Sequence, residues 1–382
     1  MKIFFGSGQI SEKEISSGNI PDFIVDNNSD LWGKDLLGVL IKSPESIKKT
    51  HISQVIICSS SITDIVEQLG ELGVESSKIN VSNFIGAVAR THALEAYRFE
   101  GYVSSGLPST TKSLKGGGIY YVKEQNDSIL VEKIFEANTH GMILEEDTLI
   151  FTAQGVGVVI YDIQRKEVLK TISLPEGYRP HGVRQRDGQL FVACSSADVI
   201  LQIENDQVIR TYEISDKIKK IGTAQHHIND LYVDEHSIYV SMFSLSGNWK
   251  KGVFDGGVLE IDRDTGNQKI IMQDLKMPHS VGMIDDTLIV LDSYRGIVRG
   301  YDGVPIGALP GFVRGISTAD NFIIVGESKN RNISKLEPKL TFSSIDTRIT
   351  IIDSKISASR SVALPRGISE IHAIASIKNR SD

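Results

Sequence analysis

The sequence predicts two folds in one chain, an α/β Rossmann-like domain at residues 1–80 and an all-β six-bladed β-propeller at residues 101–382. Three observations lead to this prediction. Strand-like and helix-like segments alternate at the start of the chain, which is typical of a parallel sheet covered by helices. Helical periodicity ends near residue 101, and short runs rich in Val, Ile and Tyr follow, separated by Gly, Asp and Asn. These later runs recur at an interval of roughly 40 residues, as propeller blades do.

The first 80 residues contain three buried-strand patterns and one clear helix. The strands are predicted at "KIFF", "PDFIVD" and "QVIICSS", and the helix at "ITDIVEQLGELGV", which has helical apolar spacing and a terminal glycine. We therefore expect a parallel, doubly wound sheet. Residues 81–100 are predicted to form a connecting helix between the two domains.

Two glycines directly follow the first predicted strand, in the segment "FFGSGQIS". At such a position backbone N–H groups and a helix N-terminus can hold a phosphate, so Gly6 and Gly8 are candidate nucleotide-binding residues. Asp26 ends the second strand, where a carboxylate can accept ribose hydroxyls. Ser11 replaces the third glycine of the dinucleotide fingerprint. The pattern fits a nucleotide or nucleotide-sugar site, and equally a Rossmann-like scaffold without a ligand.

The second part of the chain repeats one hairpin pattern, in which a polar residue precedes an apolar strand, a turn and a second strand. Three copies begin with histidine, at His140, His181 and His279. Arg314 takes this place in a fourth copy, and Asn229 takes it in the copy that contains His227. A last, half-length copy surrounds His372.

Each hairpin is followed by two more strand-like runs, which gives four strands to a unit. Five whole units leave one strand at the end of the chain and three at residues 101–137. We therefore expect the last blade to combine strands from both ends of the propeller, because this closes the ring and leaves no open sheet edge.

The recurring residues are predicted to meet, because the innermost strands of all blades line the central channel. Neutral imidazole is a common ligand of Zn²⁺, Mn²⁺ and Fe²⁺, and several on one ring can hold an ion. We assign His181, His227, His279 and His372 as metal ligands, and Arg314, Asn229 and His140 as catalytic residues. The alternative is a structural role in which these side chains hydrogen-bond neighbouring blades.

Two insertions interrupt the repeat. Residues 243–257 carry Trp249 and are expected to form a lid, a binding wall or an ordinary surface loop. Residues 326–338 contain Ser328 and Lys329, which suit an anion.

Composition limits the partners of the protein. The net charge is −7 and no large basic cluster occurs, so a nucleic-acid partner is not expected. We expect a small-molecule or sugar substrate, a cytoplasmic protein and no membrane span, because no charged leader precedes an apolar run and no apolar run reaches the roughly 20 residues that a bilayer requires. The two cysteines, Cys58 and Cys194, fall in different predicted domains and suggest no disulfide.

The stretches "KIFFGSGQIS" and "QVIICSSSITDIVEQLGELGV" resemble the small Rossmann-like module of bacterial sugar acyltransferases and sugar C-methyltransferases. In the acyltransferases this module contributes to nucleotide-sugar binding. The resemblance covers residues 1–80 and implies the same role for Gly6, Gly8 and Asp26.

The stretches "HHINDLY", "MPHSVGMIDDTLIVLDSYRGIV" and "LPGFVRGI" resemble a bacterial propeller family of unknown function over most of residues 135–335. This resemblance supports the propeller but supplies no reaction. It draws attention to a set of residues that includes His227, Asn229, Pro278, His279, Arg314, Ser328 and Lys329.

These observations lead to three functional hypotheses. The first is a bacterial enzyme of glycan or glycoconjugate metabolism, such as polysaccharide biosynthesis, with a metal-dependent lyase or hydrolase site in the channel and a nucleotide-sugar-binding N-terminal domain. The second is a non-catalytic propeller scaffold or sensor that binds a nucleotide-sugar. The third is an NAD-dependent oxidoreductase.

Overall fold

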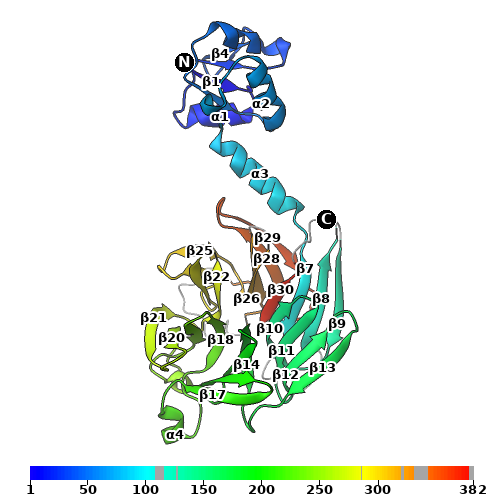
Figure 1. Cartoon of the computed structure of the whole chain (residues 1–382), viewed down its shortest axis with the longest axis vertical. Helices are drawn as coiled ribbons and strands as arrows, with labels where there is room; N and C mark the ends of the chain where they lie inside the picture. The colour runs from blue at the N-terminus through cyan, green and yellow to red at the C-terminus, as the bar shows by residue number, and fades with distance from the viewer. Residues whose placement is uncertain (108–115, 126–127, 285, 320–321, 331–342, 378–382) are drawn as a thin grey trace. The chain divides into compact units, whose positions relative to one another are not determined.

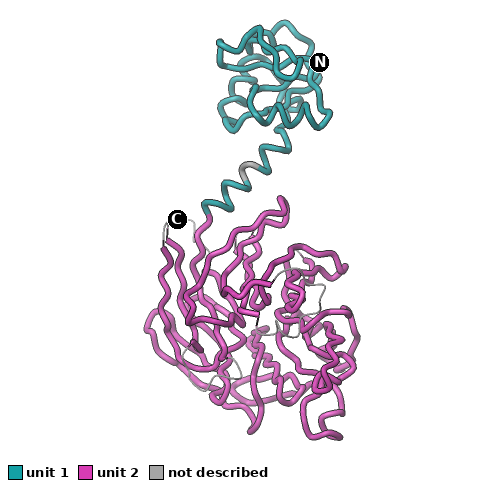
Figure 2. Tube along the Cα trace, turned by 180° about the vertical axis from the view of Figure 1, so that it is seen from behind, with its two compact units in different colours: residues 1–96 teal, residues 97–382 magenta. Residues whose placement is uncertain are grey.

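The structure is a computed structural model that describes residues 1–107, 116–125, 128–284, 286–319, 322–330 and 343–377, with the backbone alone at 88–89. The chain divides into two compact units, Met1–Ala96 and Tyr97–Asp382 (Figure 2). Each unit has its own hydrophobic core.

The first unit is built on a six-stranded sheet with the strand order β3-β4-β2-β1-β5-β6. Its strands are β1 (Lys2–Phe5), β2 (Phe23–Val25), β3 (Asp35–Leu36), β4 (Val39–Lys42), β5 (Gln54–Ile57) and β6 (Ile79–Val81). Its α-helices are α1 (Gln9–Ser16), α2 (Ile62–Glu71) and α3 (Asn83–Ala96), and short 3₁₀ helices lie at Ser29–Leu31, Pro44–Lys49 and Ser76–Lys78.

The strands β4, β2, β1, β5 and β6 run parallel, whereas β3 is antiparallel to β4. The sheet is therefore mixed, and the prediction of a wholly parallel sheet is wrong at this edge. The cause is a two-residue turn in which Leu37 has φ 51° and Gly38 has φ 83°. Positive φ at both central residues is the signature of the type I′ turn that joins antiparallel strands.

Strand β1 is buried on both faces, because Ile3 and Phe5 pack in one apolar cluster and Phe4 packs in another. This explains why the central strands read as continuous apolar runs. The predicted connecting helix at 81–100 corresponds to α3, and Tyr97 already belongs to the second unit. Among the residues described, no helix is long and apolar enough to cross a membrane.

The second unit consists of six four-stranded sheets, so the prediction of a six-bladed β-propeller is confirmed (Figure 1). Blade one contains β10 (Thr139–Glu145), β11 (Thr148–Ala153), β12 (Gly157–Asp162) and β13 (Glu167–Ile172). Blade two contains β14 (Pro180–Arg186), β15 (Gln189–Cys194), β16 (Val199–Glu204) and β17 (Gln207–Glu213). Blade three contains β18 (Ile228–Val233), β19 (Ser237–Met242), β20 (Gly256–Asp262) and β21 (Gln268–Leu275).

Blade four contains β22 (His279–Ile284), β23 (Thr287–Asp292), β24 (Ile297–Gly300) and β25 (Pro305–Ala308). Blade five contains β26 (Phe312–Ala319), β27 (Phe322–Ser328), β28 (Arg348–Asp353) and β29 (Ala358–Ala363). Blade six contains β30 (Ala373–Ser376), β7 (Glu100–Ser105), β8 (Gly118–Glu124) and β9 (Ile129–Phe135). Helix α4 (Lys217–Ile221) and a 3₁₀ turn at Trp249–Lys251 lie in connections.

The ring closes in blade six, where β30 pairs antiparallel with β7. A second tie joins blade five to blade six, because the Arg360 guanidinium donates to the two carboxylate oxygens of Glu124 at 2.7 and 2.6 Å. The apolar clusters also bridge blades: Ile150 and Val158 of blade one pack with Val183 and Val192 of blade two. Since each blade buries its face only against a neighbour, the ring is stabilised as a whole.

Candidate metal centre in the propeller

A β-bulge recurs near the start of the inner strand in each of the first five blades. The ladder register shifts between Thr139 and Met142 in β10, and between Pro180 and Val183 in β14, with matching shifts in β18, β22 and β26. A bulge leaves extra residues outside the regular pairing and redirects their side chains. The bulged residues include His140 in β10 and His181 in β14, and Asn229 holds the equivalent place in β18.

Glycine follows the histidine in the first two blades, and it lets the inner strands approach each other closely. A Cβ on Gly141 would lie 2.6 Å from both the carbonyl oxygen of His181 and the backbone nitrogen of Val183. A Cβ on Gly182 would lie 2.5 Å from Oδ1 of Asp230 in blade three. The close packing of these backbones brings the preceding histidines of adjacent blades together.

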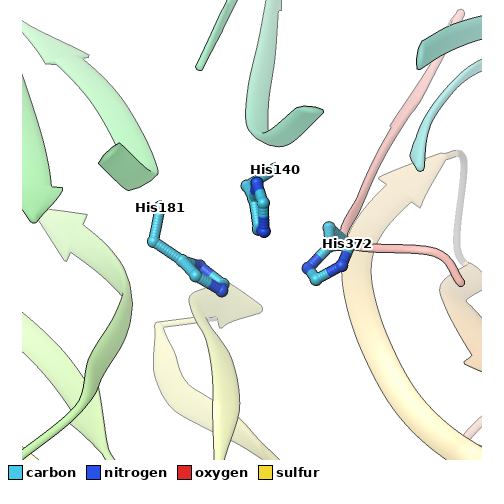
Figure 3. Close-up of side chains that lie close together, drawn as sticks. All are labelled: His140, His181 and His372. Atoms are coloured by element: carbon cyan, nitrogen blue, oxygen red, sulfur yellow. The ribbon is translucent and has the colours of Figure 1, made fainter. Parts of the chain in front are cut away.

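His140, His181 and His372 point toward one another (Figure 3). One potential ligand nitrogen from each residue lies within 4.8 Å of the other two. The ring centroids are 4.6 Å apart for His140 and His181, 4.2 Å for His140 and His372, and 5.5 Å for His181 and His372. All three side chains are buried, with exposed fractions of 6, 7 and 6%. They belong to blades one, two and six, which are neighbours in the closed ring.

Other residues extend this trio into a closed circle of contacts. The ring of His279 lies 5.9 Å from that of His181 and 5.6 Å from that of Phe312. The Arg314 guanidinium lies over the Phe312 ring at 4.6 Å, and Arg314 Nη1 is 3.3 Å from Nε2 of His372.

The predicted grouping of the recurring residues is therefore revised. The group of potential ligands contains His140, which was predicted as catalytic, and omits His227 and His279, which were predicted as ligands. His279 stays in the circle, but His227 lies just outside it, before β18 begins. Arg314 lies in the circle, as expected.

Asn229 and Ser328 link blades to each other. The fully buried amide of Asn229 donates from Nδ2 to the carbonyl oxygen of Pro278 at 3.0 Å, directly before His279. The hydroxyl of Ser328 donates to the carbonyl oxygen of Ile371 at 3.1 Å, directly before His372. We therefore correct the role of Asn229 from catalysis to the positioning of blade four. Most of the second predicted insertion, 326–338, lies outside the described residues.

Sequence reasoning missed Glu370, which lies two residues before His372 in an irregular segment. Its buried Oε2 is 3.1 Å from Nε2 of His372 and 3.4 Å from Nη1 of Arg314. It also missed Gln154, whose Nε2 is 3.4 Å from Nε2 of His140. Neither residue recurs at the repeat phase, so only the proximity of Glu370 to His372 in "EIH" hinted at it.

The buried histidines are held in the neutral form. Burial lowers the pKa of His181 well below its usual range, and the neighbouring rings of His140 and His372 lower it further. Burial and the positive charge of Arg314 likewise lower the pKa of His279. A neutral imidazole keeps a lone pair for a metal or a proton.

Two nitrogens in this cluster have informative surroundings. Nδ1 of His279 is 3.0 Å from the carbonyl oxygen of Met277, which can only accept, so Nδ1 carries the proton and Nε2 keeps the lone pair. Within the described residues, the buried Nδ1 of His181 has no hydrogen-bond partner. Buried polar atoms in proteins nearly always have one, and a bound ion or water is a common explanation for the exceptions.

His227 stands at the edge of the site in an aromatic setting. Its ring lies 4.4 Å from the rings of both Phe243 and Trp249. Its backbone has a left-handed φ of 53°, and its N–H donates to Oδ1 of Asp198 at 3.0 Å. Non-glycine residues rarely adopt this conformation, and those that do cluster at functional sites.

In the first unit, the predicted nucleotide-binding residues are engaged with each other. Oδ2 of Asp26 accepts the backbone N–H of Ser7 at 2.8 Å and the Ser7 hydroxyl at 2.7 Å, and Oδ1 accepts the N–H of Asn28 at 2.8 Å. Gly6 has φ 102°, and a Cβ there would lie 2.9 Å from the carbonyl oxygen of Cys58. These contacts give Gly6 and Asp26 a local structural role, whereas a Cβ on Gly8 would meet nothing within 4 Å.

A separate cavity of about 470 Å³ lies between blades three and four. Its lining includes Tyr239, Glu260, Met283 and Tyr301, and none of the recurring histidines. The candidate site is therefore distinct from this surface cavity.

Family models match two stretches of the chain. The model described as "Domain of unknown function (DUF4915)" matches residues 216–381, and the model described as "C2185-like, N-terminal" matches residues 2–80. The first match supports the predicted propeller family, although it starts later in the chain than the resemblance did. The second is not a match to a sugar acyltransferase family, so that likeness is not shown. A comparison with curated proteins found no match.

Comparison with solved structures supports the architecture. A chain in "Crystal structure of Nidogen/Laminin Complex" is similar with a TM-score of 0.52 at 12% identity, covering 73% of this chain and 98% of that one. A luciferin-regenerating enzyme aligns with a TM-score of 0.43 at 13% identity, covering 59% of this chain and 76% of that one. At such identities the likeness concerns the fold alone.

Proposed function

We propose that the propeller is a lyase or hydrolase that acts on a small anionic substrate at a divalent-metal centre held by His140, His181 and His372. One observation carries this proposal: three buried imidazoles from three adjacent blades place their potential ligand nitrogens within 4.8 Å of one another. Three imidazole ligands with remaining open positions suit Zn²⁺, Mn²⁺ or Fe²⁺. A metal held in this way would polarise a substrate oxygen or lower the pKa of a water molecule.

Arg314 is suited to orient an anionic group of the substrate. Its guanidinium is buried, packs over the Phe312 ring and is tied to Glu370 at 3.4 Å, so its position is fixed. A planar guanidinium offers several N–H donors to a carboxylate or phosphate.

Glu370 is suited to orient His372. Metal-binding histidines commonly donate their second ring nitrogen to a carboxylate, which fixes the ring and the tautomer. The 3.1 Å contact between Oε2 of Glu370 and Nε2 of His372 fits this arrangement if Nδ1 of His372 is the ligand atom. His279, with its lone pair on Nε2, is suited to accept a proton from the substrate.

Elemental analysis of full-length protein purified without chelator tests the metal centre. We expect one equivalent of a divalent metal, and its loss in a His181→Ala/His372→Ala double variant. His236→Ala is the matched control, because this exposed histidine in a turn of blade three is remote from the cluster. Metal-free wild-type protein with the same fold would favour the non-catalytic scaffold.

Cobalt substitution then separates a catalytic centre from a structural one. A catalytic site keeps open coordination positions, whereas a structural site is closed. We expect oxalate to change the visible absorption of Co²⁺-loaded protein, and Arg314→Gln to weaken this response while the metal stays bound. An unchanged spectrum at saturating oxalate would contradict the enzyme proposal.

Nucleotide-sugar binding by the first unit, and with it a role in glycan metabolism, stays a prediction. Thermal shift with UDP-, GDP- and dTDP-sugars tests it. A shift with NAD alone would favour the oxidoreductase.

A further inference from the structure

We propose that the insertion between β19 and β20 forms an aromatic subsite, made of His227, Phe243 and Trp249, that binds the ring of a small ring-bearing acid. The charged group of that acid would reach toward Arg314. This inference deepens the proposed function and rests on it only for the position of the acidic group.

The aromatic subsite is accessible where the metal cluster is not. His227 and Trp249 are partly exposed, whereas His140, His181 and His372 are buried. The exposed Lys250 places its ammonium 4.5 Å from the centre of the Trp249 ring. A mobile surface cation over this face shows that a solvent-borne group can occupy it, and a ligand ring can displace the ammonium.

The insertion is fixed by its own hydrogen bonds. The Ser244 hydroxyl donates to Oδ1 of Asp255 at 2.6 Å and accepts the N–H of Asn248 at 2.9 Å. The N–H of Ser246 donates to Oδ2 of Asp255 at 3.1 Å. A surface loop held this firmly presents its side chains in one arrangement, which lowers the entropy lost on binding.

Trp249 and His227 are held by the segment that precedes β18. The indole Nε1 donates to the carbonyl oxygen of Ala224 at 3.1 Å, which sets the orientation of the ring. The buried carboxylate of Asp198 accepts the N–H groups of His226 and His227 at 2.9 and 3.0 Å. This clamp maintains the strained backbone of His227, whose φ is 53°.

Ring contacts connect the subsite to the buried cation. Phe243 lies 5.2 Å from His279, which in turn lies 5.6 Å from Phe312, over which the Arg314 guanidinium packs. His227 also acts electrostatically on both His181 and His279, so it lies near the metal cluster. An apolar wall that ends at a fixed cation is complementary to a molecule with a flat apolar face and an acidic group. Sugar acids and aromatic acids share this chemistry.

Fluorescence offers a direct test, because the chain has only two tryptophans, Trp32 and Trp249. In full-length Trp32→Phe protein, Trp249 is the single reporter. We expect glucuronate or benzoate to change its emission saturably, with glucose and acetate binding at least tenfold more weakly. A response to glucuronate identifies a sugar acid, and a response to benzoate identifies an aromatic acid. No saturable change, or equally strong binding of glucose or acetate, would overturn the proposal.

Calorimetry of variants adds a second readout. Trp249→Leu should weaken the ring acid about tenfold, and Trp249→Phe should restore most of the affinity because an aromatic face remains. Equal affinity in wild type and Trp249→Leu would overturn the proposal. Chelator-treated protein separates the two proposals: a persistent Trp249 response in metal-free wild type supports the subsite and rejects the metal centre. Bound metal without any Trp249 response does the reverse.

Discussion

The two units of the chain treat their candidate functional residues in opposite ways. In the propeller, His140, His181 and His372 are buried and face each other. In the first unit, Asp26 spends both carboxylate oxygens on Ser7 and Asn28. The propeller thus concentrates polar groups on one another in a buried place, whereas the first unit satisfies them locally near its surface.

The difference follows from how each unit was built. Repetition places equivalent residues at the same depth in every blade, so a histidine at one phase meets the histidine of the next blade. A motif that occurs once has no such partner, and its polar groups are satisfied by their nearest neighbours.

The largest expected effect concerns metal binding to the propeller. Zn²⁺ at a thousandfold excess over its dissociation constant should stabilise the native chain by about 4 kcal/mol, because it binds the folded state alone. Differential scanning calorimetry of chelator-treated protein, with and without Zn²⁺, measures this. His181→Ala/His372→Ala should abolish the effect and His236→Ala should keep it. Stabilisation that survives the double variant would place the metal elsewhere, including the first unit.

Glycine substitutions sharpen the comparison next. Gly141→Ala should destabilise the protein by roughly 2–3 kcal/mol, because its Cβ would lie 2.6 Å from backbone atoms of blade two. Gly8→Ala in the first unit should change stability by less than about 0.5 kcal/mol, since its φ of −87° suits alanine and no atom lies within 4 Å of the added Cβ. Urea unfolding measures both. Equal effects would show that the inner strands are not packed as closely as described.

The buried histidines predict a pH dependence. His181 and His279 have pKa values well below the usual 6.5 in the folded protein, so below that pH the unfolded chain binds protons that the folded chain does not. Stability should therefore be constant above about pH 7 and should fall as the pH drops, by up to about 1.4 kcal/mol per unit for each histidine.

Metal-depleted protein, unfolded in urea at pH 7.5 and pH 5.5, tests this dependence. His279→Asn should flatten it, and the exposed His236→Asn should not. A pH dependence identical in wild type and His279→Asn would contradict the neutral, buried state of His279.

The smallest effect is expected in the first unit. Ser7→Ala removes one hydrogen bond to Asp26 and should destabilise this unit by about 1 kcal/mol. Thermal unfolding followed through Trp32 in a Trp249→Phe background measures it. If nucleotide-sugars also bind Ser7→Ala protein more tightly, the engagement of Asp26 by Ser7 restricts a ligand site, and the contrast between the units is weaker than described.

The sequence predicted the propeller well because the repeat phase and the spare strands at 101–137 carry long-range information. It also predicted that residues around the axis converge. It assigned His227 and His140 to the wrong groups, because membership depends on bulge geometry and on which blades are neighbours after the ring closes. Glu370 was missed because it lies outside the repeat. The β3–β4 hairpin was missed because its turn carries Leu37 at positive φ, where a sequence pattern favours Asn or Gly.

The most direct test of the account is an anomalous diffraction measurement at the zinc edge, on crystals of full-length protein loaded with one equivalent of Zn²⁺. The account predicts a single strong peak at about 2.0–2.2 Å from one nitrogen each of His140, His181 and His372. A peak bound by other residues, or none between these three rings, would contradict it.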